Sequence, residues 1–393
     1  MNKIPNGWKE KKLKYIAEIT SSKRIYEYEY VDSGIPFYRG KEITALKNNQ
    51  KIENFIYISE KRYNELKEKY GVPIKYDILI TAVGTVGNAY TIEDDKPFYF
   101  KDGNLLWLKN IKEYPKFVEY LFECNKNVLL NNFLGSVQHA LTISRLENLT
   151  FYFLPLDEQK RIASALSKID AYLENTIKLI EEKERFKRGI AKKLLTCKEG
   201  ENIPEARFKG FEDEWEETQI LEFVNNNIIK IEKGKSITKS KIEEGDIPVI
   251  AGGKTPPYYH NKYNYNFPCI TISASGSAGY VWFHDYKIWA SDCHVIYTDN
   301  KRYNIKFLYH YLKNIQDLIY YLQVGGVQKH VYAKDLIKLN IPNITIEEQE
   351  KIGGYLSLLD EEIDNLKKQK ELIKEMKRGA MQKLLSGEVR LLE

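Results

Sequence analysis

The sequence predicts an α+β protein: two mixed α/β domains joined and separated by two long antiparallel coiled-coil helices, with a pseudo-two-fold axis relating the halves. Three observations lead to this fold class. A charged segment of about 40 residues with an apolar stripe occurs twice, at a constant offset of 190 positions. The segment before each copy repeats more weakly. Both of these preceding segments consist of short β-branched and aromatic runs separated by Gly, Pro, Asn and Asp.

The repeat divides the chain into four consecutive segments. At 393 residues the chain is long enough for two domains that each bury a core. We expect a first α/β domain at residues 1–154 and a first long helical segment at 155–199. A second α/β domain at 200–343 and a second long helical segment at 344–393 follow.

The two long helices are predicted by apolar residues at spacings of three and four, flanked by charged residues. The offset aligns Glu158-Gln159 with Glu348-Gln349. Thr345 and Glu348 have the spacing of a capping box, and Gly387 follows the last turn of the second helix. A single striped helix is not stable alone in water. We therefore expect the two copies to pack against each other; packing on the adjacent domain or on a partner protein is the alternative.

The two α/β domains share a layout. Each opens with a Trp-bearing stretch and has an Ile-Pro pair before an apolar run, at Ile35-Pro36 and Ile247-Pro248. Each has a strand that ends in a loop of small residues, in "DILITAVGTVGNAY" and "PCITISASGSAGYVWF", and closes with a turn of the Gly-Val-Gln type, in "FLGSVQHALT" and "QVGGVQKHVYAKD". We expect the five tryptophans to lie in cores rather than at a ligand: Trp8, Trp107, Trp215, Trp282 and Trp289.

Composition restricts the function only loosely. The net charge of +5 neither demands nor excludes nucleic acid. Between Ile250 and Asn340 thirteen tyrosines and ten Lys or Arg stand beside five Asp or Glu, which suits contact with phosphates and bases or, equally, an aromatic β core. No membrane-spanning apolar run and no signal-peptide pattern occur, so we expect a cytoplasmic protein. The four cysteines form no C-x-x-C pair, so we expect reduced thiols and no metal site.

Motifs that would indicate catalysis are incomplete. "AGGKT" at 251–255 resembles the end of a phosphate-binding loop, but Pro248 occupies the place of the required first glycine. "TPPYY" at 255–259 is similar to an amino-methyltransferase signature, but Thr255 is a poor substitute for the Asn or Asp that grips the amine. No glycine-rich turn for a methyl donor follows an upstream strand. We expect the chain itself to be non-catalytic.

The Glu-Gln-x-x-Ile start of each long helix and its Arg-Gly…Lys-Leu-Leu end resemble the specificity subunit of a type I restriction–modification system. The "GSVQ" and "GGVQK" turns and the "ISASGSAGY…WASDCHV" run are similar to the recognition domains of that family. The resemblance covers nearly the whole chain. Both prolines that precede the helices are expected just before the first turn, but four positions separate Pro155 from Gln159 and seven separate Pro342 from Gln349. The unequal spacing leaves the exact approach of the chain to the first helix open, but not the identity of that helix.

The resemblance implies a division of labour. Two target-recognition domains would grip double-stranded DNA in successive major grooves and read a bipartite, asymmetric sequence, and the helices would set the gap between its halves. Two methyltransferase subunits would dock on the helices and methylate adenine N6 from S-adenosylmethionine. Two motor-nuclease subunits would add ATP- and Mg-dependent cleavage, so the chain itself would need no cofactor. The alternatives are a two-domain scaffold that binds no DNA and dimerises through a coiled-coil arm, and a standalone enzyme.

Candidate DNA contacts are side chains that can read base edges or meet phosphates, near the small-residue loops, where the backbone can approach a duplex closely. In the first domain they are Arg39, Lys41, Thr81, Thr85, Asn88, Gln138 and His139. In the second domain they are Lys254, Tyr258, Tyr259, His260, Asn261, Lys262, Ser273, Ser275, His294, Gln328, Lys329 and His330. Any one of them could instead be a solvated loop residue or a buried hydrogen-bond partner.

Overall fold

The computed structural model describes residues 7–126, 129 and 140–391. The chain forms two compact units. Unit 1 consists of Met1–Ile177 and Lys368–Glu393, and unit 2 consists of Lys178–Lys367. Each unit thus contains one α/β domain and a part of both long helices. This division differs from four consecutive segments because apolar residues of both helices enter each core.

The long helices are α7 (Leu156–Leu195) and α12 (Ile346–Leu385), each of 40 residues. Both lie inside the predicted helical segments and differ by the predicted offset. At the start of α12 the Glu348 backbone N–H donates to Thr345 Oγ1 (3.4 Å), and Gly387 takes a left-handed φ of 75° just past its end. The predicted caps are therefore present, although the Glu348 side chain turns to Arg207 instead of completing the capping box.

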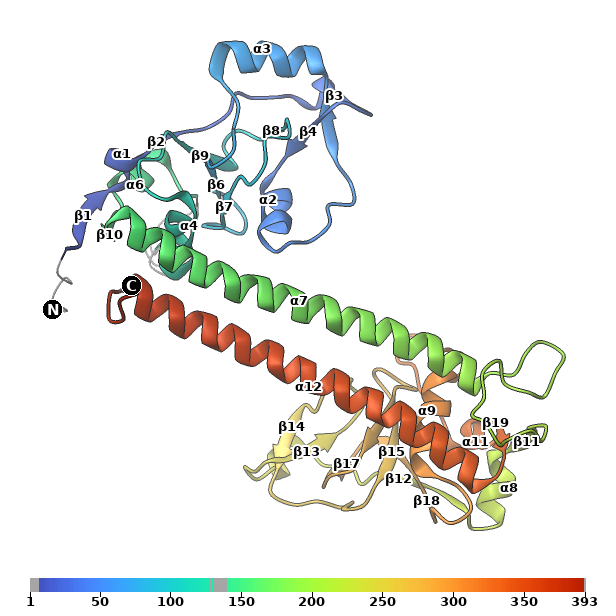
Figure 1. The fold of residues 1–393 in the computed structure, drawn as a ribbon. Helices are drawn as coiled ribbons and strands as arrows, with labels where there is room; N and C mark the ends of the chain where they lie inside the picture. Colours follow the sequence, from blue (N-terminus) through green and yellow to red (C-terminus); the bar gives the residue numbers. More distant parts are fainter. Residues whose placement is uncertain (1–6, 127–128, 130–139, 392–393) are drawn as a thin grey trace. The chain divides into compact units, whose positions relative to one another are not determined.

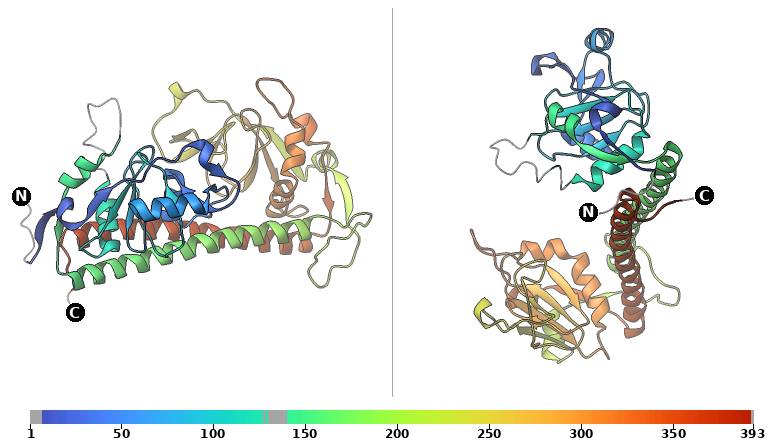
Figure 2. Two further views of the ribbon diagram at one scale, coloured as in Figure 1. Left: turned by 90° about the horizontal axis from the view of Figure 1, so that it is seen from above. Right: turned by 90° about the vertical axis from the view of Figure 1, so that its left-hand side faces the viewer.

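The helices pair within each unit, and the residues in contact run in opposite directions along them. In unit 1 the Gln369 amide donates to Tyr172 Oη. In unit 2, Lys183 lies 2.7 Å from Glu362 and Lys367 lies 2.7 Å from Glu184. Figure 2 shows the paired helix segments of each unit side by side. Antiparallel pairing of the two helices is confirmed within each unit. Packing of a long helix on an α/β domain, which was given as the alternative, occurs as well.

The described part of the α/β domain of unit 1 holds two four-stranded sheets and one strand pair (Figure 1). The antiparallel sheet has the order β2 (Glu18–Thr20), β9 (Leu105–Lys109), β6 (Ile78–Thr81), β7 (Ala89–Thr91). The mixed sheet has the order β3 (Tyr30–Val31), β5 (Ile56–Ile58), β4 (Ile35–Tyr38), β8 (Tyr99–Phe100). Strand β1 (Lys9–Lys12) pairs with β10 (Thr150–Phe153). The helices are α1 (Leu13–Ile16), α2 (Gly40–Lys47), α3 (Glu60–Tyr70), α4 (Pro115–Cys124) and α6 (Ile143–Asn148).

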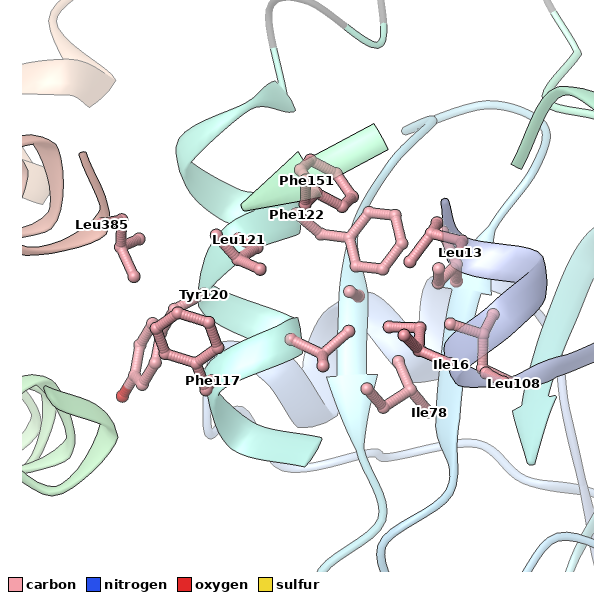
Figure 3. Close-up of a cluster of buried hydrophobic side chains, with 14 of the residues drawn as sticks. Leu13, Ile16, Ile78, Leu108, Phe117, Tyr120, Leu121, Phe122, Phe151 and Leu385 are labelled. Carbon is pink, nitrogen blue, oxygen red and sulfur yellow. The ribbon is translucent and has the colours of Figure 1, made fainter. Parts of the chain in front are cut away.

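The main core of unit 1 lies between α4 and the antiparallel sheet. Pro115 starts α4 at a position that tolerates proline, and the helix then buries the continuous run from Phe117 to Phe122. Figure 3 shows Phe122 facing the strands that carry Ile78 and Leu108, while Leu385 of α12 approaches α4 from the opposite side. Burial of each such side chain contributes roughly 1.5–3 kcal/mol. The core therefore holds the long helices to the domain.

Unit 2 repeats this plan with different residues. Its antiparallel sheet has the order β12 (Ile229–Lys233), β18 (Cys293–Thr298), β15 (Cys269–Ser273), β16 (Val281–His284). A second sheet has the order β14 (Tyr258–His260), β13 (Ile247–Ile250), β17 (Trp289–Ala290), and β11 (Glu216–Gln219) pairs with β19 (Asn340–Asn343). The helices are α8 (Ile220–Asn225), α9 (Ile305–Asn314), α10 (Gln316–Tyr321) and α11 (Ala333–Leu336). Every residue of β15 is buried, as expected for a central strand covered on both faces.

Two expectations about local structure need adjustment. Pro342 does not stand just before a helix but lies inside β19, opposite Glu217 of β11. In both units two residues lie between the end of the preceding strand, at Phe153 or Asn343, and the first residue of the long helix, so the unequal proline spacing does not alter the approach. Trp8, Trp107 and Trp215 are buried as predicted, whereas Trp282 and Trp289 are only half-buried.

Candidate nucleic-acid interface

In unit 1 the predicted contacts gather where the loop between β6 and β7 meets the start of α2. Thr44 Oγ1 lies 3.1 Å from Thr85 Oγ1 and accepts a hydrogen bond from the Asn88 amide (3.1 Å). The loop turns through Gly84 and Gly87, whose φ angles of 79° and 84° favour glycine. The small-residue pattern thus marks a loop held against α2.

The side chains at this meeting point divide into exposed and internal ones. Lys41 and Thr85 are exposed. Arg39 is half-buried and pairs with Glu42 (2.7 Å). Burial alone would raise the pKa of the Glu42 carboxyl, but hydrogen bonds from Arg39 keep that pKa below its ordinary value. Glu42 is therefore charged. Lys41 and Thr85 can meet a ligand from the surface. Lys41 Nζ lies 3.6 Å from Glu42 Oε1, so an anion would compete with Glu42 for both Lys41 and Arg39.

Lys126 was not predicted from the sequence and lies beside this loop. Its Nζ donates to Asn88 Oδ1, and burial together with nearby Lys47 lowers the pKa of Lys126. A lysine at the end of a helix carries no local signal that it reaches a loop 38 positions earlier in the chain.

In unit 2 three loops converge: residues 251–257, 274–280 and 322–332. The Ser277 N–H donates to Gly252 O (2.6 Å), and the Val331 N–H donates to Ala274 O (3.1 Å). A Cβ atom at Gly252 would lie 2.7 Å from Ser275 O, so the first two loops can approach this closely only with glycine there. The loops therefore form one connected surface.

The predicted residues of this surface are cationic or polar: Lys254, Gln328 and Lys329 are exposed, and Ser275 and His330 are half-buried. Four further predicted residues are exposed outside the three loops, on and just after β14: Tyr258, Tyr259, Asn261 and Lys262. Asn261 and Lys262 donate to Glu243 (2.8 and 2.9 Å), so an anion would have to compete for them. Val327, at the tip of the third loop, is fully exposed. Lys239, missed by the sequence analysis, lies 5.9 Å from the Tyr258 ring.

Five predicted contact residues are buried and hydrogen-bonded inside the fold, so we revise their role from DNA contact to support of the loops. The Thr81 hydroxyl donates to Thr85 O and accepts from the Asn88 N–H (2.9 Å). His260 Nδ1 accepts from the Glu243 N–H, and the Ser273 hydroxyl donates to Ala251 O (3.4 Å). His294 Nε2 lies 2.9 Å from Val331 O and ties the third loop to β18. The revised residues are Thr81, Asn88, His260, Ser273 and His294.

Two predicted contacts of the first domain, Gln138 and His139, lie outside the described residues.

No group of three or more His, Cys, Asp or Glu side chains that could hold a metal ion occurs among residues 7–126, 129 and 140–391. Cys269 and Cys293 are free thiols, and burial raises the pKa of each to about 12. Among the same residues, no helix has the length and apolar character needed to cross a membrane.

The chain is similar to known proteins along nearly its whole length. The family model "Type I restriction modification DNA specificity domain" matches residues 5–182 and 212–375. The putative type I restriction enzyme MjaX specificity subunit of Methanocaldococcus jannaschii is 27% identical over 100% of this chain and 96% of that protein. The putative specificity subunit S.HindORF215P of Haemophilus influenzae is 34% identical, but over 41% of this chain and 40% of that protein.

Two solved structures share the fold. The S subunit of a type I restriction–modification system from M. genitalium superposes with a TM-score of 0.65 at 19% identity, covering 98% of this chain and 97% of that chain. A chain solved in work on complex assembly and conformational transition of the type I R-M system gives a TM-score of 0.56 at 16% identity, covering 99% and 100%.

Proposed function

Because the chain belongs to the type I restriction–modification DNA specificity family, we propose that its two α/β domains read the two halves of one bipartite, asymmetric DNA sequence while its long helices carry the catalytic subunits. The chain itself is a non-catalytic specificity subunit. One observation carries the bipartite reading: the two units repeat the same framework but present different side chains at the loops where base contact is predicted. Thr85 and, at the start of α2, Lys41 are exposed in unit 1, whereas Lys254 and Lys329 are exposed in unit 2.

The chemistry of these loops supports direct reading of DNA. Lysine donates to base edges in the major groove and also neutralises phosphates, and glutamine and asparagine both donate to and accept from base edges. On β14 of unit 2, Tyr258 and Tyr259 are exposed and offer aromatic rings for contact. Loops held by backbone hydrogen bonds lose little conformational freedom on binding, which favours specific recognition.

Docking of two copies of one methyltransferase is supported by apolar side chains that both helices expose, one of them at matching positions. Phe186 of α7 is 51% exposed and Met376 of α12, 190 positions later, is 50% exposed. Leu179 is seven residues before Phe186 and Leu372 four before Met376, spacings that put each pair on one helix face. Exposed apolar side chains grouped in this way mark protein-binding sites. One pair belongs to each unit, so identical partners would meet similar surfaces.

The remaining roles belong to the partner subunits in this proposal. S-adenosylmethionine would bind the methyltransferase subunits, ATP and Mg would bind two motor-nuclease subunits, and the complex would act in the cytoplasm. The test is to express the chain with a methyltransferase subunit encoded beside it and to map methylated adenines across the host DNA. We expect N6-methyladenine in a split, asymmetric sequence that disappears when the chain is omitted. Unchanged methylation without the chain, or none with it, would contradict the proposal.

A further inference from the structure

A polar cluster lies where the domain of unit 1 meets both long helices. Tyr120 Oη of α4 donates to Asp170 Oδ2 of α7 (2.6 Å), and Ser167 Oγ of α7 lies 3.1 Å from the same hydroxyl. Lys377 Nζ of α12 lies 2.8 Å from Asp170 Oδ1. One carboxylate therefore connects the domain helix and the two long helices.

Unit 2 contains the same cluster with the long helices exchanged. His310 of α9, Ser357 and Asp360 of α12 stand 190 positions after Tyr120, Ser167 and Asp170. His310 Nε2 lies 3.1 Å from Ser357 Oγ, and Nδ1 lies 4.0 Å from Asp360 Oδ2. Here the lysine is Lys187 of α7, which pairs with Asp360. We call Tyr120, Ser167, Asp170 and Lys377 the anchor cluster of unit 1, and His310, Ser357, Asp360 and Lys187 the anchor cluster of unit 2.

The domain residue is neutral in both clusters, but only Tyr120 hydrogen-bonds the aspartate, because His310 Nδ1 lies 4.0 Å from Asp360, beyond hydrogen-bond distance. Burial, with Lys187 and Lys306 adding to it, lowers the pKa of His310 to about 3, so His310 is neutral and its contact with Asp360 is not an ion pair. Burial and the hydrogen bond to Asp170 raise the pKa of Tyr120, so this hydroxyl also stays neutral. In both units a neutral polar group of the domain meets Ser and Asp of one long helix and a lysine of the other.

Ion pairs connect the anchor cluster of unit 1 to α2, which carries part of the candidate interface. Lys377 Nζ lies 2.6 Å from Glu123 Oε1 of α4, and Glu123 Oε2 lies 3.3 Å from Lys47 at the end of α2. Burial lowers the pKa of Lys377, but Glu123 and Asp170 outweigh it and the pKa is raised, so this lysine stays charged. The helix held in this way begins next to Arg39.

We propose that the anchor clusters are positioning devices that fix the orientation of each recognition domain on the helix pair and thereby restrict the gap between the two DNA half-sites. Apolar contacts alone are non-directional and allow a domain to tilt. Asp170 and Asp360, in contrast, each link three elements, because each pairs with a lysine of the other long helix and lies next to a polar side chain of the domain. Partly buried ion pairs are disrupted by small shifts. This inference rests on the proposed function, because only a chain that reads both half-sites can have a preferred gap.

The test uses the assembled complex with its methyltransferase. DNA duplexes would keep both mapped half-site sequences constant and vary the gap one base pair at a time, and methylation of each would be measured. We expect the wild-type complex to prefer one gap. Asp360→Asn should raise methylation at the two adjacent gaps by about tenfold relative to the preferred gap, because the lysine partner is lost. Tyr120→Phe, which removes one hydroxyl, should broaden the preference less.

Two controls separate positioning from general damage. His310→Tyr places the residue of the unit 1 cluster in unit 2 and should keep the wild-type gap preference. Lys192→Met removes an exposed lysine from α7 and should also keep it. Thermal unfolding of each variant shows whether it folds, and if Asp360→Asn does not, Tyr120→Phe carries the test. An unchanged gap preference in the folded variants would refute the proposal, as would equal loss of methylation at every gap. A wild-type complex that methylates no duplex would refute the proposed function itself.

Discussion

Replacing Gln349 by Leu removes a side chain that joins the start of α12 to the domain of unit 2. Gln349 is buried; its amide donates to Ile344 O (2.8 Å), and its Oε1 accepts from the Asn304 N–H (2.8 Å). Asn304 caps α9, so one glutamine fixes the beginnings of two helices. Gln159 does the same in unit 1, with Leu154 O (2.7 Å) and the Tyr114 N–H (3.0 Å).

The expected loss of stability follows from the groups left without partners. Leucine fills a similar volume, so the cavity contribution is small, but the Asn304 N–H and Ile344 C=O lose the side chain that satisfies them. A buried unsatisfied group costs about 1–3 kcal/mol. Both groups here are only partly buried, so the free energy of unfolding of unit 2 should fall by roughly 2 kcal/mol in total. Gln159 has the two corresponding partners in unit 1 and also donates to the buried Glu113 carboxylate (2.6 Å), so Gln159→Leu should destabilise unit 1 at least as much.

Hydrogen exchange followed by mass spectrometry measures each unit separately. Gln349→Leu should speed exchange in peptides that cover Asn304–Phe307 and the start of α12, and leave unit 1 peptides near the wild-type rate. Gln382→Leu, at an exposed position of α12, is the matched control and should change little. A stability loss below about 1 kcal/mol for Gln349→Leu would show that the buried amide is not what joins the two helix starts.

Three further predictions concern charge. Arg207→Met removes a bidentate ion pair with Glu348 (2.7 and 2.8 Å), in which the two side chains are 11% and 2% exposed. Urea unfolding should show unit 2 destabilised by about 3 kcal/mol, and a loss near zero would contradict this. Lys329→Glu should weaken binding of the mapped DNA sequence by the assembled complex by about tenfold in a gel shift. The control Lys192→Glu should leave binding unchanged. Equal effects of the two substitutions would argue against loop 322–332 as a DNA contact. Burial lowers the pKa of His284 from 6.5 to about 3. The unfolded chain therefore protonates this imidazole more readily than the folded chain does. The free energy of unfolding should be at its full value above pH 6.5 and fall as the pH is lowered toward 3. His284→Gln should reduce that slope in unfolding measured between pH 7 and 4, and an unchanged slope would contradict the assignment.

The long helices could be predicted closely because their signal is local and repeated. A stripe of apolar residues over 40 positions leaves little freedom of interpretation, and the helices begin and end within a few residues of the expected bounds. The small-residue loops were recognisable for a similar reason, since Gly84 and Gly87 take backbone conformations that other residues avoid.

The contact residues could be predicted only in part, because the polar residue types that read bases also satisfy buried backbone groups. His294 and His330 look alike in the sequence, yet His294 lies under the third loop and His330 lies in it. Tertiary packing decides between the two roles. The anchor clusters were not visible for the same reason: the link from Lys377 to Asp170 joins positions 207 apart, and no spacing rule relates them.

The two kinds of contact explain how one framework can carry two different reading surfaces. The framework contacts at Gln159 and Gln349 are buried and directional, so a substitution there costs stability whichever DNA sequence is read. Lys254 and Lys329 are exposed and lie on loops that backbone hydrogen bonds hold together. Substitutions at such positions remain within small stability changes. The loops can therefore change their DNA preference independently in each unit, while the helix starts and the anchor clusters keep the same arrangement.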